Sequence, residues 1–185
     1  FYDVSEEFIT GGLGHVARFL NTGVDRGKIT REVDDALQAR VQPSPDLAGF
    51  APCSLIVEAI IEDLEAKRDL FTRLESIVAA DTILASNTSS ISITRIAAAT
   101  QRPDRVIGMH FMNPVPVMRL VEVVRGLGTS EETLDAIMAT CRAMGKEPVQ
   151  VNDAPGFVSN RILCPMINEA VFALQEGVAS AEAID

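Results

Sequence analysis

The feature that most constrains the fold is a regular alternation of short apolar, β-branched runs with helical patterns through the middle of the chain. Leu55–Ile61 is one such run, and apolar residues at helical spacing follow it over Leu64–Val78. Thr82–Ala85 and Arg105–Met109 are further strand-like runs. Strands and helices that alternate at this period predict a mostly parallel, doubly wound α/β sheet of the Rossmann-like kind. Because Leu55–Ile61 is almost continuously apolar, we expect its strand to be covered on both faces.

Capping residues and local apolar patterns predict the remaining elements of this part of the chain. In chain order these are the end of a strand at Phe1–Val4, a helix capped by Ser5, a helix over Thr30–Ala39, a short strand at Val41, a helix that opens at about Ser92, a strand over Leu120–Val124, a helix with Thr129 and Glu132 as its capping box, and a strand over Pro148–Val151.

The pattern changes after Pro155. Residues 158–176 contain no strand signal and read as one helix, in which Pro165 should cause a kink or a local irregularity. Gly177 should stop that helix, and Ser180 should cap another. We therefore place a domain boundary here, with residues 1–155 as the α/β domain and residues 156–185 as the beginning of an all-α domain.

Composition narrows the classes of function. The formal charge of −10 argues against non-specific nucleic-acid binding, so an anionic ligand would need a local basic cluster. No apolar run approaches the ~20 residues of a membrane span, which predicts no membrane partner. The cysteines Cys53, Cys141 and Cys164 lack metal-ligand spacing, so we predict no metal and interpret them as small core residues of a reducing compartment.

A glycine motif near the start of the chain has an unsuitable context. Gly12–Ala17 matches the dinucleotide fingerprint G-x-G-x-x-A, which requires an apolar strand directly before it. Here the preceding segment, Ser5–Thr10, reads as the start of a helix. We interpret the match as coincidence and His15 as an ordinary residue of the helix surface.

The candidate catalytic pair is His110 and Glu122. His110 stands where one predicted strand ends, and a histidine can exchange a proton near neutral pH. Glu122 lies in the next strand, where its carboxylate could orient the imidazole and stabilise its charged form. Spacing alone favours a structural histidine and a solvated glutamate.

The predicted fold strengthens the functional interpretation of His110. Ligands of open parallel sheets bind at the carboxyl ends of the strands. Asp3, Glu62, the Ser86–Ser90 turn and His110 are all predicted to lie at such ends. Their convergence favours a functional site over isolated structural roles.

Three separated motifs carry a resemblance to a known family. The stretches ILASNTSSISIT, RVIGMHFMNPVPVMRLVEVV and DAPGFVSNRILCPMINEAV closely resemble the L-3-hydroxyacyl-CoA dehydrogenases, and within them the short bacterial enzymes that act on 3-hydroxybutyryl-CoA. The resemblance implies NAD-dependent oxidation of a short-chain (S)-3-hydroxyacyl-CoA to the 3-oxoacyl-CoA, in fatty-acid or butanoate metabolism. It further implies a cytoplasmic enzyme that is a homodimer when complete.

The same resemblance assigns the catalytic residues. His110 corresponds to the base that takes the proton of the C3 hydroxyl, and Glu122 to its carboxylate partner. Ser89 corresponds to the hydroxyl that binds the substrate oxygen. Asn160 corresponds to the amide that approaches the substrate from the second domain.

On the cofactor side, the resemblance assigns Asp3 to the adenosine ribose hydroxyls of NAD, and its charge favours NAD over NADP. Other positions that contact or line the NAD site are Glu62, Lys67, Asn87 and Asn113. Two alternatives stay open, because Lys67 could be a plain surface lysine of a helix and Asn113 could serve only its turn. Arg26 and Lys28 are candidate cations for the CoA phosphates.

The chain differs from the family pattern at both ends, and two alternative functions stay open. The family's first strand and glycine-rich loop would precede Phe1, and most of its helical domain would follow Asp185. We therefore expect residues 1–185 alone to bind NAD poorly. One rival is a non-catalytic protein on the same fold. Another is a 3-hydroxyisobutyrate-type dehydrogenase, which would be expected to use a lysine base where this chain has a histidine.

Overall fold

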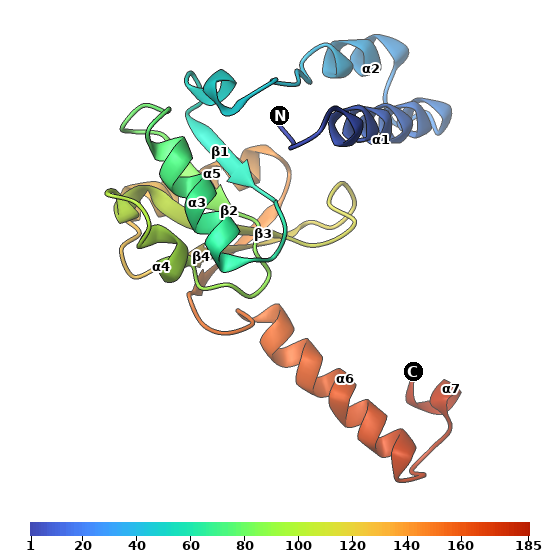
Figure 1. Ribbon diagram of the computed structural model, residues 1–185. Helices are drawn as coiled ribbons and strands as arrows, with labels where there is room; N and C mark the ends of the chain where they lie inside the picture. Colours follow the sequence, from blue (N-terminus) through green and yellow to red (C-terminus); the bar gives the residue numbers. More distant parts are fainter. The chain divides into compact units, whose positions relative to one another are not determined.

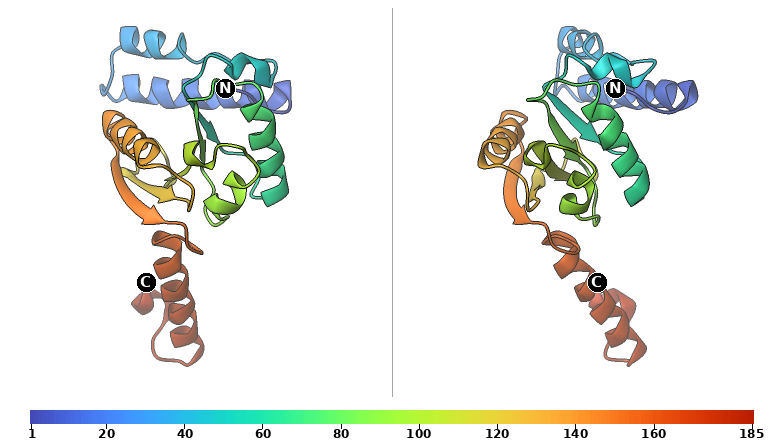
Figure 2. Two further views of the ribbon diagram at one scale, coloured as in Figure 1. Left: turned by 90° about the vertical axis from the view of Figure 1, so that its left-hand side faces the viewer. Right: turned by 60° about the vertical axis from the view of Figure 1, so that its left-hand side comes forward.

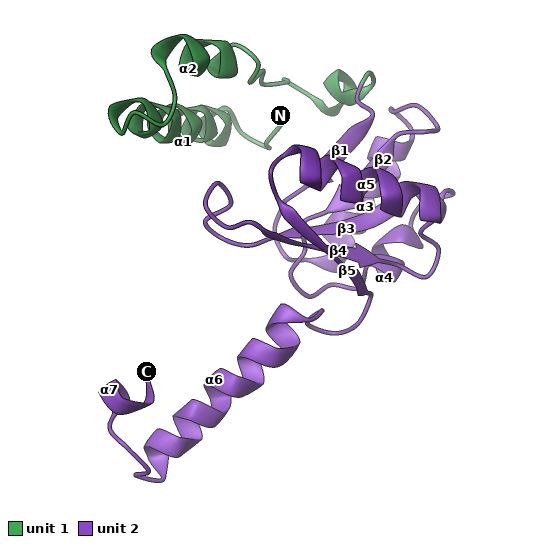
Figure 3. Cartoon of the chain, turned by 180° about the vertical axis from the view of Figure 1, so that it is seen from behind, with its two compact units in different colours: residues 1–52 green, residues 53–185 purple.

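The computed structural model describes residues 1–185 and divides into two compact units, Phe1–Pro52 and Cys53–Asp185 (Figures 1 and 3). The first unit contains the helices α1 (Glu6–Asp25) and α2 (Arg31–Gln38) and the 3-10 helix η1 (Leu47–Phe50). The second unit contains, in chain order, β1 (Leu55–Glu58), α3 (Leu64–Glu75), β2 (Ile83–Ser86), α4 (Ile93–Ala97), η2 (Pro103–Arg105), β3 (Val106–Phe111), β4 (Leu120–Arg125), α5 (Glu131–Ala143), β5 (Glu147–Asn152), α6 (Ser159–Gln175) and α7 (Ala181–Ile184).

The second unit is built on one five-stranded sheet in the order β1-β2-β3-β4-β5. The pairs β1–β2, β2–β3 and β4–β5 are parallel, whereas β3 and β4 form an antiparallel pair. This mostly parallel sheet, followed by a helical segment, confirms the predicted α/β class. The antiparallel pair places His110 directly opposite Glu122.

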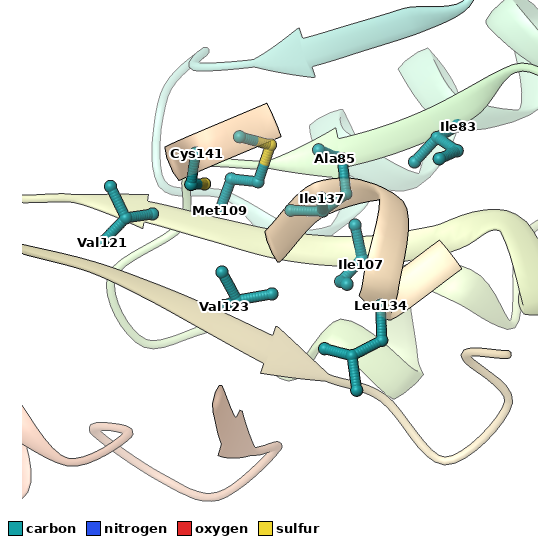
Figure 4. Packing of buried hydrophobic residues seen from close by; sticks show 9 residues of the cluster. All are labelled: Ile83, Ala85, Ile107, Met109, Val121, Val123, Leu134, Ile137 and Cys141. Carbon is teal, nitrogen blue, oxygen red and sulfur yellow. The ribbon is translucent and has the colours of Figure 1, made fainter. Parts of the chain in front are cut away.

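The sheet has a helix layer on each face (Figure 2). Side chains alternate between the faces, and α5 packs on the face of Ile107, Met109 and Val121 (Figure 4). On the other face, Ile93 of α4 lies so close to Gly108 that an added Cβ would come within 2.9 Å of its side chain. His110 lies two residues after Gly108 in β3, so both point to the same face and the His110 side chain lies on the face away from α5.

Three helices begin where the sequence predicts. The hydroxyls of Ser5, Thr30 and Ser92 accept hydrogen bonds from the backbone at the starts of α1, α2 and α4. The predicted capping box of α5 was wrong by one residue, because Ser130 is the cap and accepts from the Thr133 N–H. Thr129 is instead buried, and its hydroxyl donates to the Val106 carbonyl.

Three strand predictions required correction. The predicted strand over Leu55–Ile61 stops at Glu58, and the exposure of Val57 shows that β1 is not covered on both faces. Phe1–Val4 and Val41 lie outside strands. Phe1 exchanges two backbone hydrogen bonds with Gln42 and Ser44, which is too few to form a ladder.

The final part of the chain is helical as predicted. Pro165 lies inside the continuous helix α6, and Gly177 follows α6 with a positive φ of 73° that suits a residue without a Cβ. Ser180 precedes α7 as its cap. No helix in the chain combines the length and the apolar character that crossing a membrane requires.

Candidate functional site

The centre of the site is a buried pair formed by His110 and Glu122. The His110 Nδ1 lies 2.8 Å from the Glu122 Oε2, and the two side chains are 7% and 2% exposed. A carboxylate that accepts a hydrogen bond from Nδ1 fixes the tautomer in which Nε2 carries a lone pair. The Nε2 atom has no hydrogen-bond partner in the protein, so it is free to accept a proton from a ligand.

The carboxylate of Glu122 is also held by the start of α6. Its Oε1 accepts from the N–H groups of Val158 and Ser159 at 2.9 and 2.8 Å. Its Oε2 accepts from the Ser159 hydroxyl at 2.7 Å, beside the bond from His110. Burial acts to raise the pKa of Glu122, but the hydrogen bonds from Ser159, His110 and Val158 outweigh it and lower the pKa below its usual value.

An aromatic ring covers the imidazole. Phe157 is buried, and its ring meets that of His110 edge-on, with centroids 5.6 Å apart and planes at 60°. Phe157 has a φ of 51° and follows Gly156, whose φ is 76°. These consecutive left-handed conformations lead the chain from β5 into α6. No sequence signal assigned a role to Phe157 or Ser159, although both lie in the stretch DAPGFVSNRILCPMINEAV.

A second buried network lies at the end of β1. Lys67 is only 1% exposed, and its Nζ donates to Glu58 Oε1 at 2.6 Å. Glu58 Oε2 accepts from the Ser86 hydroxyl at 2.6 Å, which links β1 to β2. The alternative of a plain surface lysine was therefore wrong. Glu58 was not among the predicted site residues, because its position reads as the middle of the longer apolar run Leu55–Ile61.

Glu62 connects this network to the serine turn, residues 87–91, that follows β2. Its Oε1 accepts from the Thr88 hydroxyl and from the N–H groups of Ser89 and Ser90, while its Oε2 lies 3.4 Å from Lys67 Nζ. Burial acts to raise the pKa of Glu62, but the hydrogen bonds from Thr88, Ser89 and Ser90, together with the Lys67 charge, give a net lowering. The carboxylate therefore stays charged and fixes the turn that carries Ser89.

Asp153 holds the start of α4, directly after the serine turn. Its carboxylate accepts from the Ser92 hydroxyl at 2.7 Å and from the N–H groups of Ile93 and Thr94 at 3.1 and 2.8 Å, at the start of α4. Burial acts to raise the pKa of Asp153, but the hydrogen bonds from Thr94, Ser92 and Ile93 lower it overall. Asp153 begins the stretch DAPGFVSNRILCPMINEAV, but no role for it was predicted from the sequence.

The structure brings Ser89 and Asn160 together. The Asn160 Nδ2 donates to the Ser89 carbonyl at 3.2 Å, across 71 positions of sequence. Both residues line an open cleft of about 700 Å³ between the serine turn and the first turns of α6. The other residues that line this cleft are Ser90, Pro155, Gly156, Arg161, Cys164 and Pro165.

The remaining candidate residues make no hydrogen bond with His110 or Glu122. Asn87 is half-buried, and its Oδ1 accepts from the Phe111 N–H at 2.9 Å, which ties the serine turn to β3 beside His110. Asn113 is exposed in the segment between β3 and β4. Asp3 belongs to the first unit, where its Oδ1 accepts from the Val4 N–H at 2.7 Å. The CoA candidates Arg26 and Lys28 are exposed in the same unit, just after α1.

Residues 1–154 match the NAD-binding domain of 3-hydroxyacyl-CoA dehydrogenase, and residues 156–185 match its C-terminal domain. The chain belongs to the 3-hydroxyacyl-CoA dehydrogenase family. Members of this family are NAD-dependent oxidoreductases, which confirms the resemblance seen in the three motifs and the NAD assignment. The structure contains no group of three or more His, Cys, Asp and Glu side chains that could hold a metal ion.

Relatives within the family are similar over the whole chain. It is 52% identical over 184 residues to a probable 3-hydroxybutyryl-CoA dehydrogenase of Bacillus subtilis, covering 100% of this chain and 64% of the relative. It is 43% identical to 3-hydroxybutyryl-CoA dehydrogenase of Bradyrhizobium diazoefficiens, covering 99% of this chain and 62% of the relative. The chain thus spans less than two thirds of the length of these dehydrogenases.

Solved structures of the family have the same fold. The crystal structure of (S)-3-hydroxybutyryl-CoA dehydrogenase from Ralstonia eutropha superposes with a TM-score of 0.95 at 46% identity, covering 100% of this chain and 65% of that one. The 3-hydroxybutyryl-CoA dehydrogenase from Escherichia coli gives a TM-score of 0.96 at 43% identity, covering 100% of this chain and 39% of that one.

Proposed function

We propose that the complete protein oxidises the 3-hydroxyl group of a short-chain (S)-3-hydroxyacyl-CoA, such as 3-hydroxybutyryl-CoA, to the 3-oxo thioester with NAD. The observation that carries the proposal is the buried His110–Glu122 pair, whose free Nε2 is suited to accept an alcohol proton. The names of the relatives from Bacillus subtilis and Ralstonia eutropha support the same substrate. The role fits a cytoplasmic enzyme of fatty-acid or butanoate metabolism.

His110 serves as the general base. Loss of hydride from C3 leaves a carbonyl only if the hydroxyl proton departs, and a histidine with a pKa near the working pH suits that task. Glu122 keeps the Nδ1–H tautomer and stabilises the imidazolium that forms. The ring of Phe157 limits the access of water to the pair, because it is buried against the imidazole.

Ser89 and Asn160 position the substrate oxygen. Their shared cleft combines a hydroxyl from the turn after β2 with an amide from α6. Small polar groups of this kind bind a C3 oxygen without changing its charge and restrict its orientation relative to the base. Glu62 supports this geometry by holding the serine turn, and Asp153 holds the start of α4 that follows it.

The residues at the carboxyl ends of β1 and β2 fit NAD, which accepts the hydride in this family. Asn87 uses only its carbonyl oxygen within the protein, so its amide NH₂ can donate to a ligand. Glu62 is 41% exposed and presents a charged oxygen at the same edge. Lys67 would act through Glu58 and Glu62, because both of them engage its ammonium. Asp3 and Asn113 would contribute as exposed polar side chains.

The domain organisation follows from the same proposal. Residues 1–155 would form the NAD-binding domain, and residues 156–185 would begin a helical domain for substrate binding and dimerisation. The two family matches meet near this boundary, which supports it. The complete protein would be a homodimer, and Arg26 and Lys28 would supply cations for the CoA phosphates.

The test is NADH formation by the complete protein. We expect turnover with (S)-3-hydroxybutyryl-CoA and none with free 3-hydroxybutyrate or 3-hydroxyisobutyrate at equal concentration. A series of acyl-CoA chain lengths would locate the preferred substrate. Oxidation of the free acids in preference to the thioester would refute the proposed substrate class, and absence of NADH with every substrate would favour a non-catalytic protein on this fold.

A further inference from the structure

We propose that Ser159 is a positioning residue that holds Glu122 for His110 and so couples the first turn of α6 to the proton-accepting pair. The inference deepens the proposed function and rests on it for its catalytic meaning. Its structural basis is independent, because the hydrogen bonds of Ser159 are present whatever the reaction is.

Ser159 contacts Glu122 through two different groups. Its backbone N–H donates to Oε1 at 2.8 Å, and its hydroxyl donates to Oε2 at 2.7 Å. The carboxylate is thus held at both oxygens by one residue, and the Val158 N–H adds a second bond at Oε1. A carboxylate bound at both oxygens cannot rotate without losing several charge-assisted hydrogen bonds.

The hydroxyl of Ser159 and the ring of His110 share one acceptor. Glu122 Oε2 lies 2.7 Å from Ser159 Oγ and 2.8 Å from His110 Nδ1. A hydroxyl that donates to this oxygen withdraws part of the negative charge that stabilises the imidazolium. Ser159 should therefore keep His110 a weaker base than an unshared glutamate would, while it fixes the carboxylate in the plane that the ring requires.

Glu122 on β4 is the charged group that bonds the imidazole of His110. Phe157 packs against the ring from the segment before α6. The other charged groups around the site hold one another or the turn. They are Glu58, Glu62 and Lys67 at the end of β1, Asp153 at the start of α4, and Arg161, which lines the cleft; none of them forms a hydrogen bond or ion pair with the ring. A change at Ser159 should therefore reach His110 through Glu122.

The position of Ser159 gives this contact a further consequence. Asn160 follows it directly and donates to the Ser89 carbonyl, so the same first turn of α6 bonds both to the catalytic carboxylate and to the serine turn. The geometry therefore links the placement of Asn160 in the cleft to the charge on Glu122.

The experiment is an NMR titration of the histidines in the complete protein, without substrate or cofactor. We expect Ser159→Ala to raise the pKa of His110 by roughly half a pH unit, because Glu122 loses one donor but keeps its two backbone bonds. Ser159→Thr, which keeps the hydroxyl, should return the pKa to that of the parent protein. His15 is exposed on α1 and provides an internal reference that should not move.

The pH profile of kcat/KM supplies the second readout, in which the acidic limb of Ser159→Ala should move upward by the same amount. An unchanged or lowered His110 pKa in Ser159→Ala, or equal shifts in the Ala and Thr variants, would overturn the proposal. A shifted pKa without a matching shift of the limb would leave the coupling intact and instead count against His110 as the general base.

Discussion

His110 and Glu122 face each other directly across the antiparallel pair β3–β4, with 2.8 Å between Nδ1 and Oε2. Residues that oppose each other in this way have Cβ atoms about 5 Å apart, which suits a bond between a ring and a carboxylate. A slip of one residue would turn the two side chains to opposite faces of the sheet. The pairing register of the strands therefore determines the geometry of this pair.

We predict that His110→Gln in the complete protein lowers kcat by roughly 10²-fold or more, which is the usual scale of general-base catalysis. NAD affinity should change little, because the imidazole is proposed to contact the substrate and not the cofactor. Steady-state kinetics and calorimetry with NAD measure the two effects. His15→Gln on the exposed surface of α1 is the control, and a His110 variant with wild-type kcat would remove this residue from the mechanism.

We predict that Glu122→Gln lowers activity and moves the acidic limb of the pH–rate profile downward. The adjacent anion favours the imidazolium, so its removal lowers the histidine pKa. The profile of kcat/KM against pH is the measurement, and Glu147→Gln at an exposed position of β5 is the matched control. If rate and limb both stay unchanged, Glu122 has only a structural role.

We predict that Lys67→Met destabilises the complete protein by about 3–5 kcal/mol, because it leaves Glu58 buried without its cation. Adding Glu58→Gln to this variant should recover part of the loss, since no unpaired charge then remains. Denaturant unfolding measures both. Arg73→Met, at an exposed position of the same helix, should have little effect, and a similarly small effect of Lys67→Met would show that the ion pair contributes little.

We predict that Asp153→Asn lowers the unfolding free energy by about 2 kcal/mol at pH 7, because a carboxylate that accepts charge-assisted bonds at the start of α4 is replaced. The pKa of Asp153 is lowered in the folded state. The stability it contributes is therefore present above the unfolded pKa of about 3.9 and is lost as pH falls through the lower folded value.

The difference between Asp153→Asn and the parent protein should accordingly shrink as pH falls below about 4. Urea unfolding at a series of pH values tests this dependence. The exposed Asp135→Asn on α5 serves as the control. A difference that stays constant in acid would mean that the charge of Asp153 is not what stabilises α4.

The sequence by itself determined the order and type of most elements, because helix caps and apolar periodicity are local signals. Ser5 was identified as a cap, and helix starts were placed at Thr30 and at about Ser92 from their immediate neighbours; the structure has helices beginning after each. Three motifs also determined the family. Local signals failed where a segment's state depends on a partner, as at Phe1–Val4 and Val41, because an apolar run becomes a strand only when another strand accepts its hydrogen bonds.

Only the tertiary structure decided the environment of the His110–Glu122 pair. Glu122 meets Val158 and Ser159 across 36 and 37 positions of sequence, and no local pattern encodes a hydrogen bond over that distance. The sequence likewise gave no sign that Lys67 is buried, and only the folded chain places its ammonium against Glu58. Sequence named His110 and Glu122 as candidates because their residue types suit proton transfer. Tertiary packing determines which groups bond the Glu122 carboxylate, because side chains distant in sequence become neighbours only when the sheet and α6 are assembled.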